Sequence, residues 1–297
     1  MSLVINHNMM AATASRNLSN SYSALATSTQ RLSSGLRINT AADDAAGLAI
    51  RELMRSDIAS INQGVRNAND AISMIQTADG ALQVVDEKLI RMKELAEQAS
   101  TGTYTSDQRL IIDSEYQAMA SEITRIANAT DFNGIYLLNG NLSSSTHSGS
   151  GLNSTGKLKV HFGSSNNSAE DYYYVQIGTS TASALGLGVG AATTADGRSI
   201  STQELAQKAL VAIQTAIVSK DKIRANLGAL QNRLENTISN LQIQGENLQS
   251  AESQISDVDV ATEMTNFVRN QILTQSAVAM LSQANSMPKM ALQLIGG

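Results

Sequence analysis

The chain has 297 residues, 42% of them hydrophobic, and a formal net charge of −5 at pH 7. This length and apolar content are enough to bury a core, and a negative net charge without a basic patch argues against nucleic acid as a partner. The absence of cysteine excludes disulfides and thiolate metal sites but does not decide the compartment.

Aromatic residues make up only 3% of the sequence, and Pro288 is its single proline. Ala, Leu, Ile, Val and Met must therefore fill the interior, which favours closely approaching helices with few helix breakers. No stretch has the pattern of a membrane span or of a classical signal peptide. We expect a mainly helical protein without membrane insertion, whose export would need a dedicated machine.

Both ends of the chain are patterned like helices but carry very little charge. Before Asp43 the charged residues are only Arg16, Arg31 and Arg37, and after Arg269 the only one is Lys289. The polar faces of these segments are rich in Ser, Thr, Asn and Gln, which is a poor surface for a soluble monomer. We expect both helices to be buried in an assembly, against each other and against copies of the same chain.

The N-terminal helix has apolar positions that alternate in steps of four and three from Leu18 to Leu36, the spacing of a coiled-coil seam. A break is predicted at Asn39 to Gly47. The next helix is predicted from Leu48 to about Ala99, and its length of about 75 Å suits a rod rather than a compact domain. Its core row repeats every seven residues: Ile61, Ala68, Ile75, Leu82, Leu89 and Ala96.

The middle of the chain changes in character. Thr105 and Gln108 have the spacing of a capping box, which predicts a third helix that ends before the turn signal Asn133-Gly134. Residues 141–199 are rich in Ser, Gly, Asn and Thr and lack a helical period. Within them, two segments favour a β-hairpin: Leu158–Phe162 and Tyr172–Ile177.

A fourth helix is predicted to start at a second capping-box pair, Ser201 and Glu204, and its heptad repeat extends from Leu227 to Ile255. Asp257 to Asp259 marks a break, and a last helix is predicted from Val260 to about Asn285. The order of segments is thus nearly symmetric about the middle of the chain. A reversal at residues 141–199 would bring the two charge-poor ends together.

We therefore predict a mainly α fold, a long antiparallel helical hairpin or coiled-coil rod formed by both termini, with a small insert that contains the β-hairpin. Residues 1–43 and 257–297 are expected to form a discontinuous terminal-helix core domain. A helical rod domain is expected from residues 44–140 and 200–256. Residues 141–199 would form a short variable surface insert, without a separate large outer domain.

No pattern of catalytic or metal-binding residues is visible. His7, His147 and His161 are far apart and none has the spacing of a zinc ligand pair. The carboxylates at Asp43, Asp44, Asp257 and Asp259 are better explained as helix caps than as acid–base pairs. We expect no enzymatic activity, no cofactor and no metal.

The segment from Gln30 to Asn39, with its continuation to Leu48, resembles the N-terminal signature of bacterial flagellins. The resemblance covers about residues 1–140 and 200–297. Further matching motifs follow in order along the chain: Asn67–Asp70, Ala78–Leu82, Glu94–Ala96, Phe132–Gly134, Ala261–Met264 and Gln283–Asn285.

This resemblance implies a structural subunit that self-assembles into the flagellar filament for motility, with the terminal helices innermost and the insert outward. One chain type whose head-to-tail contact does not close forms an open helical polymer, so the main partner is the chain itself. The resemblance also implies export in unfolded form through the flagellar type III apparatus, to an extracellular filament. The other implied partners are the filament cap protein, hook–filament junction proteins and an export chaperone that binds the C-terminal helix.

The terminal helices supply the candidate polymerisation and packing residues. These residues can form an intramolecular coiled coil, intersubunit contacts, or both on different faces of one helix. Because isolated helices are marginal until packed, we expect the ends to become ordered on assembly. The candidates are Leu18, Tyr22, Leu25, Leu32, Leu36, Met264, Phe267, Ile272, Val278 and Leu281.

The resemblance further implies recognition by the innate immune sensor Toll-like receptor 5. Lys93 stands where arginine is common in the family, which keeps the charge but not the guanidinium fork. The alternative is that these residues form an exposed helix face that lies in an intersubunit contact. The candidates are Arg91, Lys93, Glu94, Leu95 and Gln98 on one helix and Ile112 and Glu115 on the next.

Three other functions are alternatives to a filament subunit. A hook–filament junction protein would have similar termini but would not form long filaments. A flagellin with a catalytic insert would need a motif such as His-Glu-x-x-His, which is absent. A membrane-active amphipathic helix is disfavoured because the polar faces lack the Lys and Arg that lipid headgroups attract.

Overall fold

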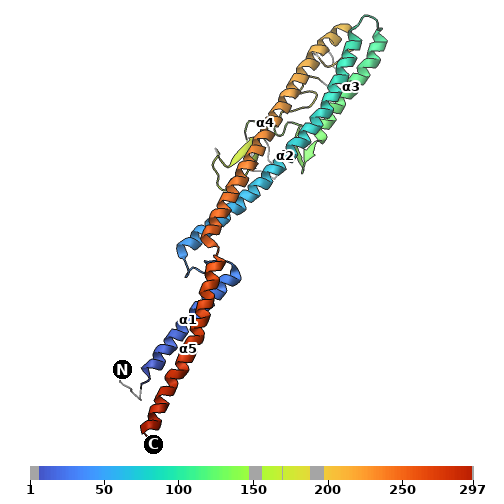
Figure 1. Cartoon of the computed structure of the whole chain (residues 1–297). Coiled ribbons are helices and arrows are strands. Elements are labelled where there is room, and N and C mark those ends of the chain that lie inside the picture. Colours follow the sequence, from blue (N-terminus) through green and yellow to red (C-terminus); the bar gives the residue numbers. More distant parts are fainter. Residues whose placement is uncertain (1–6, 147–155, 169, 188–196, 296–297) are drawn as a thin grey trace. The chain divides into compact units, whose positions relative to one another are not determined.

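A computed structural model describes residues 7–146, 156–168, 170–187 and 197–295 of the chain. Most of these residues lie in helices, which confirms the predicted mainly α fold (Figure 1). The helices are α1 (Met9–Ser34), α2 (Ala45–Ser100), α3 (Ser106–Ala129), α4 (Gln203–Ser256) and α5 (Val260–Ile295). The strands are β1 (Asp131–Phe132), β2 (Ile135–Tyr136), β3 (Leu158–His161) and β4 (Tyr172–Val175).

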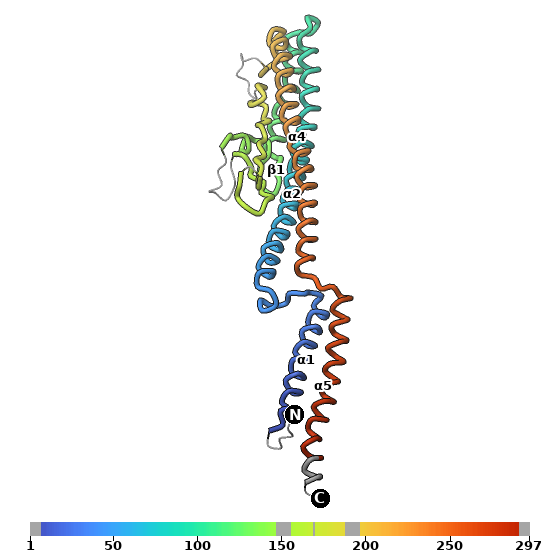
Figure 2. The backbone as a smooth tube through the Cα atoms, turned by 60° about the vertical axis from the view of Figure 1, so that its left-hand side comes forward, coloured from blue at the N-terminus to red at the C-terminus, as the bar shows by residue number. Residues whose placement is uncertain are grey.

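The chain forms two compact units, and α2 and α4 each contribute to both. Unit 1 comprises residues 1–58 and 246–297, and unit 2 comprises residues 59–245. In unit 1, α1 and α5 lie side by side and run antiparallel (Figure 2). The two charge-poor ends of the chain therefore pair with each other, as predicted.

The core of unit 2 is built on the seven-residue row of α2. Every residue of the predicted row, from Ile61 to Ala96, is buried. The C-terminal part of the row, Leu89 and Ala96, packs against Tyr116 of α3 and Ile213 of α4. The preceding part, from Ala68 to Leu82, packs against Leu227 of α4 and the insert. Burying one large apolar side chain contributes about 1.5–3 kcal/mol, so this row carries much of the stability of unit 2.

Two ion pairs join α2 to α4 beside this core. The ammonium of Lys220 is buried and contacts the carboxylates of Asp86 and of Asp221, the latter at 2.8 Å. The guanidinium Nε of Arg224 donates to Asp79 at 2.7 Å. A buried charge is costly unless it is paired, so these contacts tie the two antiparallel helices in one register.

The predicted start of α3 and the turn after it are both confirmed. Thr105 and Gln108 form a reciprocal capping box at the N-terminus of α3. Asn133 and Gly134 have φ angles of 52° and 79°, the left-handed geometry of a tight hairpin turn. This turn joins β1 to β2, a short strand pair that the sequence did not predict.

The predicted β-hairpin of the insert is present as the antiparallel pair β3 and β4. Its end docks on α2 in unit 2. The Asn67 amide donates to the carbonyl of His161 at 2.8 Å, and a Cβ on Gly64 would overlap the carbonyl of Phe162. Glycine at this helical position therefore allows the hairpin backbone to approach α2 directly.

The predicted starting cap of α4 is wrong. The Thr202 hydroxyl, not that of Ser201, accepts from the backbone N–H of Leu205 at 3.3 Å. Ser201 is held in the preceding loop, where its N–H donates to Ser199 Oγ, and the Glu204 carboxylate lies 3.4 Å from the Lys208 ammonium. The helix consequently begins at Gln203, one position later than a Ser201 cap would place it.

The last helix is longer than predicted, because α5 continues through Pro288 to Ile295 instead of ending near Asn285. Proline has no N–H, so the carbonyl of Ala284 has no helical donor at position 288. The Asn8 side-chain amide donates to that carbonyl at 2.8 Å. The hydrogen bond lost at the proline is thus replaced from the other terminus of the chain.

Candidate assembly surface

The side of α1 that faces α5 is lined by alternating leucine and serine. Leu18, Leu25 and Leu32 are half-buried at the positions predicted for the seam. The residues between them are Ser21 and Ser28, whereas Tyr22 is 65% exposed. The predicted place of Tyr22 in the α1–α5 seam is therefore wrong. Serine is small, and it lets the two helix backbones approach where tyrosine would hold them apart.

The side of α5 that faces α1 is also mostly small or polar. Two of the candidate packing residues, Phe267 and Leu281, are half-buried there. Three other candidates, Met264, Ile272 and Val278, are exposed and lie outside this seam. The other half-buried or buried positions of α5 are Glu263, Asn266, Asn270, Thr274, Ala277, Ala284, Ser286, Met287 and Pro288.

Leu36 does not extend the α1 seam, because α1 ends at Ser34. Gly35 adopts a φ of 73°, which closes the helix, and Leu36 then forms an antiparallel bridge with Asp257. Next to this bridge, the N–H of Val258 donates to the Gly35 carbonyl at 3.0 Å. The break after α1 therefore begins at Gly35, earlier than the predicted Asn39, and its first residues are hydrogen-bonded to the predicted break at Asp257 to Asp259.

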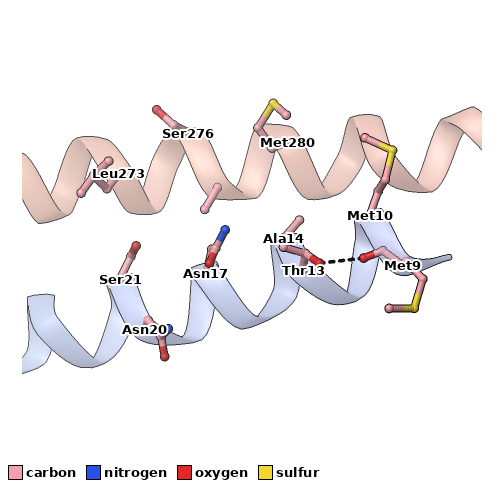
Figure 3. A pocket seen from close by; sticks show the side chains of 11 residues that line it. Met9, Met10, Thr13, Ala14, Asn17, Asn20, Ser21, Leu273, Ser276 and Met280 are labelled. Atoms are coloured by element: carbon pink, nitrogen blue, oxygen red, sulfur yellow. Dashed lines mark hydrogen bonds between the residues drawn. The ribbon is translucent and has the colours of Figure 1, made fainter. Parts of the chain in front are cut away.

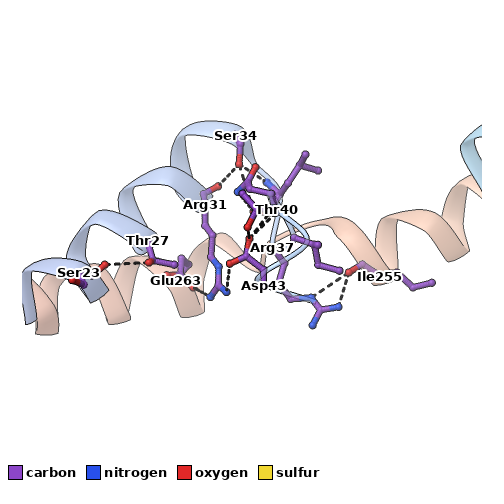
Figure 4. Close-up of polar contacts among 12 residues, drawn as sticks. Ser23, Thr27, Arg31, Ser34, Arg37, Thr40, Asp43, Ile255 and Glu263 are labelled. Carbon is purple, nitrogen blue, oxygen red and sulfur yellow. Dashed lines mark hydrogen bonds and ion pairs between the residues drawn. The ribbon is translucent and has the colours of Figure 1, made fainter. Parts of the chain in front are cut away.

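Charged groups gather where these breaks meet (Figure 4). The Arg31 guanidinium lies 3.9 Å from both Asp43 and Glu263, and Glu263 is only 7% exposed. Backbone and hydroxyl hydrogen bonds from Thr40 hold the pKa of Asp43 below its ordinary value. The Arg37 guanidinium donates to the Ile255 carbonyl at 2.7 Å. These contacts fix the direction in which α1 ends and α5 begins.

The predicted capping role is confirmed for two of the four aspartates, whereas Asp43 accepts from loop residue Thr40 and Asp257 from the hydroxyl of Ser253. Asp44 accepts from the N–H of Gly47 at 2.9 Å at the start of α2. Asp259 accepts from the N–H of Ala261 at 3.0 Å at the start of α5. Both carboxylates therefore serve helix termini.

Exposed apolar side chains are concentrated on α5, and α1 adds Met9, Met10 and Tyr22. Met264, Val268 and Ile272 form a row at four-residue spacing and line a hollow of about 540 Å³. This row could have been found in the sequence, because its spacing is that of one helix face. We call the following residues the exposed apolar set: Met9, Met10, Tyr22, Val260, Met264, Val268, Ile272, Leu273, Val278, Met280 and Met290.

A second hollow, of about 710 Å³, lies between the two helices toward their ends (Figure 3). Met9 and Met10 of α1 line it together with Leu273 and Met280 of α5. Its polar lining consists of uncharged side chains, among them Asn17. Apolar groups with neutral polar neighbours are suited to contact another protein surface of the same kind.

The candidate receptor residues do not all lie on one exposed face. The Arg91 guanidinium contacts Glu94 at 3.0 Å and Glu115 at 2.8 Å, and all three side chains are largely accessible. These contacts raise the pKa of Arg91, with the hydrogen bond to Glu115 as the largest cause.

Two other exposed candidates make polar contacts: Lys93 donates to Gln214 at 3.2 Å, and Gln98 donates to the Tyr104 hydroxyl at 3.0 Å. Leu95 is only 2% exposed, so its predicted place on the receptor surface is wrong. It lies one position before Ala96 of the buried row, and Ile112 packs against the same core.

In the parts of the chain that the structure describes, no helix combines the length and apolarity of a membrane span. Within those parts, likewise, no group of three or more His, Asp or Glu side chains is placed to hold a metal ion. His161 stacks on Tyr172, with ring centroids 6.0 Å apart, and His7 is exposed beside the start of α1.

Comparison with known proteins gives matches over nearly the whole chain. The family model of the bacterial flagellin N-terminal helical region matches residues 5–143, and that of the C-terminal helical region matches residues 210–295. A flagellar filament 33 kDa core protein of Treponema phagedenis is 42% identical over 295 residues, which cover 99% of this chain and 100% of that protein.

A flagellin of Halalkalibacterium halodurans is 41% identical over 293 residues, which cover 99% of this chain and 100% of that protein. A crystal structure of Bacillus cereus flagellin aligns with a TM-score of 0.45 at 25% identity, over 63% of this chain and 94% of that one. The two family models together include α1, α2, α3 and α5.

Proposed function

The chain belongs to the bacterial flagellins, structural subunits of the flagellar filament, and we propose that its exposed apolar set forms the contacts between subunits. The observation that carries this proposal is the two-sided character of α5. Its small and polar side packs on α1, while Met264, Val268 and Ile272 face outward. A soluble monomer gains nothing from that arrangement, whereas a homopolymer covers the outward side.

The exposed apolar set is large enough to drive association. Covering the exposed half of one such side chain contributes about 1 kcal/mol, and the whole set contributes on the order of 10 kcal/mol. Association costs about 4–15 kcal/mol in lost freedom of motion, so the set alone can offset a large part of this cost. One chain type with a contact that does not close into a ring then gives an open helical filament.

We place the parts of the chain in the filament as follows. Residues 1–43 and 257–297 form the inner domain, and residues 44–140 and 200–256 form the surrounding helical domain. Residues 141–199 are the outward insert. The support for this order is that the least charged helices carry the exposed apolar set. The buried heptad core of α2 needs no partner chain.

The remaining partners act before and during assembly. The chain is exported unfolded through the flagellar type III apparatus and reaches the extracellular filament, where a cap protein at the tip promotes its folding. Hook–filament junction proteins provide the base. An export chaperone covers the row of Met264, Val268 and Ile272 on the C-terminal helix before export, since that row is exposed in the single chain.

Recognition by Toll-like receptor 5 would use the exposed residues Arg91, Lys93, Glu94, Gln98 and Glu115 on α2 and α3. The ion pairs of Arg91 hold this surface in one arrangement. Arg91→Ala should abolish receptor signalling while filaments still form. Unchanged signalling would refute this part of the proposal.

The assembly proposal is tested with the double variant Val268→Gln/Ile272→Gln. Both side chains are exposed, so the monomer should keep its circular dichroism spectrum. Loss of two apolar contacts worth about 2 kcal/mol should raise the critical concentration for polymerisation roughly 30-fold. Sedimentation and electron microscopy measure this value.

The matched control is Val211→Gln, a residue of α4 that is 69% exposed but lies outside the exposed apolar set. It should polymerise like the wild type. An unchanged critical concentration in the double variant would overturn the proposal. Long filaments formed by the purified wild-type chain would also exclude a junction protein, which does not polymerise at length.

A further inference from the structure

Among the described residues, the most exposed and the most buried methionines lie in different units. Met9, Met10, Met264, Met280 and Met290 are 45 to 67% exposed, and all lie on α1 or α5. In contrast, Met74 and Met92 are almost completely buried in the core of unit 2. The thioether groups that solvent reaches are therefore concentrated on the proposed assembly surface.

Three of these five methionines line one hollow. Met9 and Met10 come from α1 and Met280 from α5, and the hollow of about 710 Å³ also includes Leu273 (Figure 3). The Thr13 hydroxyl donates to the Met9 carbonyl at 2.9 Å, so it is already engaged in the helix. The three methionine side chains are accessible in the single chain, in an apolar setting suited to being covered by another copy.

The chain has no cysteine and no tryptophan. Its eleven methionines are then the most readily oxidised sulfur groups available, and accessibility decides which of them react first. Peroxide at low concentration should oxidise the five exposed methionines and spare Met74 and Met92. The fold of unit 2 would remain intact under such treatment.

We propose that the five exposed methionines of α1 and α5 are a site of reversible oxidation by hydroperoxides that blocks filament assembly. This inference rests on the proposed function of the exposed apolar set. In the reaction, a thioether sulfur attacks one peroxide oxygen, an S–O bond forms and the O–O bond breaks. The sulfur loses two electrons to the peroxide, whose other oxygen takes up a proton and leaves as water or an alcohol.

The product changes the surface in a way that assembly cannot tolerate. A sulfoxide is polar and accepts hydrogen bonds, so it converts a flexible apolar side chain into one that prefers water. Covering it between two copies would remove its hydration without supplying matched donors. A methionine sulfoxide reductase with a dithiol reverses the change, because the sulfoxide oxygen leaves as water and the thiol pair becomes a disulfide.

The test compares the polymerisation of untreated and hydrogen peroxide-treated full-length chain, with peptide mass spectrometry to locate each sulfoxide. We expect sulfoxide at Met9, Met10, Met264, Met280 and Met290, none at Met74 or Met92, and a critical concentration raised at least tenfold. Both stereospecific reductases with dithiothreitol should return the critical concentration to that of the untreated chain. The five exposed methionines should also oxidise more slowly in finished filaments.

A variant with all five exposed methionines replaced by leucine, which is similar in size and cannot be oxidised, should assemble equally well before and after peroxide. The matched control Met54→Leu/Met119→Leu changes less exposed methionines and should keep the wild-type sensitivity. If oxidised wild type assembles normally with sulfoxide at the five positions, this inference is overturned while the proposed function stands. Untreated wild type that forms no filaments would overturn the proposed function and this inference with it.

Discussion

Asn8 should contribute to the stability of unit 1 in a way that depends on Pro288. The Asn8 Oδ1 accepts from the N–H of Ala11 at 3.0 Å and caps α1, while its Nδ2 donates to the Ala284 carbonyl at 2.8 Å. Asn8→Ala removes both hydrogen bonds. The lost cap costs about 1 kcal/mol, and the unpaired carbonyl costs about 1 kcal/mol more.

Pro288→Ala restores a backbone N–H that can donate to Ala284 within α5. In the Pro288→Ala background the Ala284 carbonyl has a donor within α5, so it no longer depends on the Asn8 amide. Asn8→Ala should then lower the stability only through loss of the α1 cap, by about 1 kcal/mol. The coupling energy of the double-mutant cycle is then about 1 kcal/mol. The large gain in helix propensity from replacing proline appears in both arms of the cycle and cancels.

Amide hydrogen exchange along α1 and α5 in the monomer would measure the free energy of local opening in each variant. Asn8→Asp is the matched control, since it keeps the capping oxygen but replaces the amide donor. It should retain the protection of the first turn of α1 and lose that near Ala284. The reasoning is refuted if Asn8→Ala costs the same, within about 0.4 kcal/mol, with proline or alanine at position 288.

Two further predictions concern unit 2. Gly64→Ala should destabilise unit 2 by about 1–3 kcal/mol in urea unfolding, because the added Cβ would overlap the Phe162 carbonyl. At Gly80 in the same helix an added Cβ meets no atom, so Gly80→Ala should stabilise unit 2 by about 0.5–1 kcal/mol. Equal effects of the two substitutions would contradict the docking of the hairpin. The hydrogen bond from Arg224 lowers the pKa of Asp79 in the folded chain, so its stabilising effect is present above the ordinary carboxyl pKa and is lost as pH falls through the lowered value. Urea unfolding at pH 7 and pH 3 should therefore show a smaller loss of stability in Arg224→Gln than in the wild type.

The sequence predicted unit 2 well because one face of each helix is buried within the chain. The row from Ile61 to Ala96 contains only apolar residues at a seven-residue spacing, and a single packing arrangement buries it. The cap at Thr105 and the turn at Asn133-Gly134 depend on neighbouring residues alone. Leu95 was misplaced because a motif match carries no information on which side of α2 faces the core.

The buried faces of the terminal helices were harder to predict from the sequence, for a physical reason. Assigning a core face from apolar spacing assumes that only one face is buried. On α1 and α5 small and polar residues such as Ser21 and Ser28 share the packing within the chain with leucine, and several large apolar residues, Tyr22 and Ile272 among them, are left outside. The pattern from Leu18 to Leu36 therefore mixed residues of both faces. The hydrogen bonds of Asn8 with Ala284 depend on contacts between the two termini and had no local signal.

This mixed seam sets the energetics of the terminal helices. Its leucines are interspersed with serine, asparagine and threonine and are only half-buried, so pairing α1 with α5 contributes less than the core of unit 2. Specific polar contacts, such as Asn8 with Ala284 and Arg31 with Glu263, then determine the register of the pair without making it very stable. If the exposed apolar set is covered only in the filament, most of the stabilisation of these helices comes from neighbouring copies. Under the proposed function, weak pairing in the monomer and strong burial in the polymer mean that the terminal helices gain most of their order when neighbouring copies cover them.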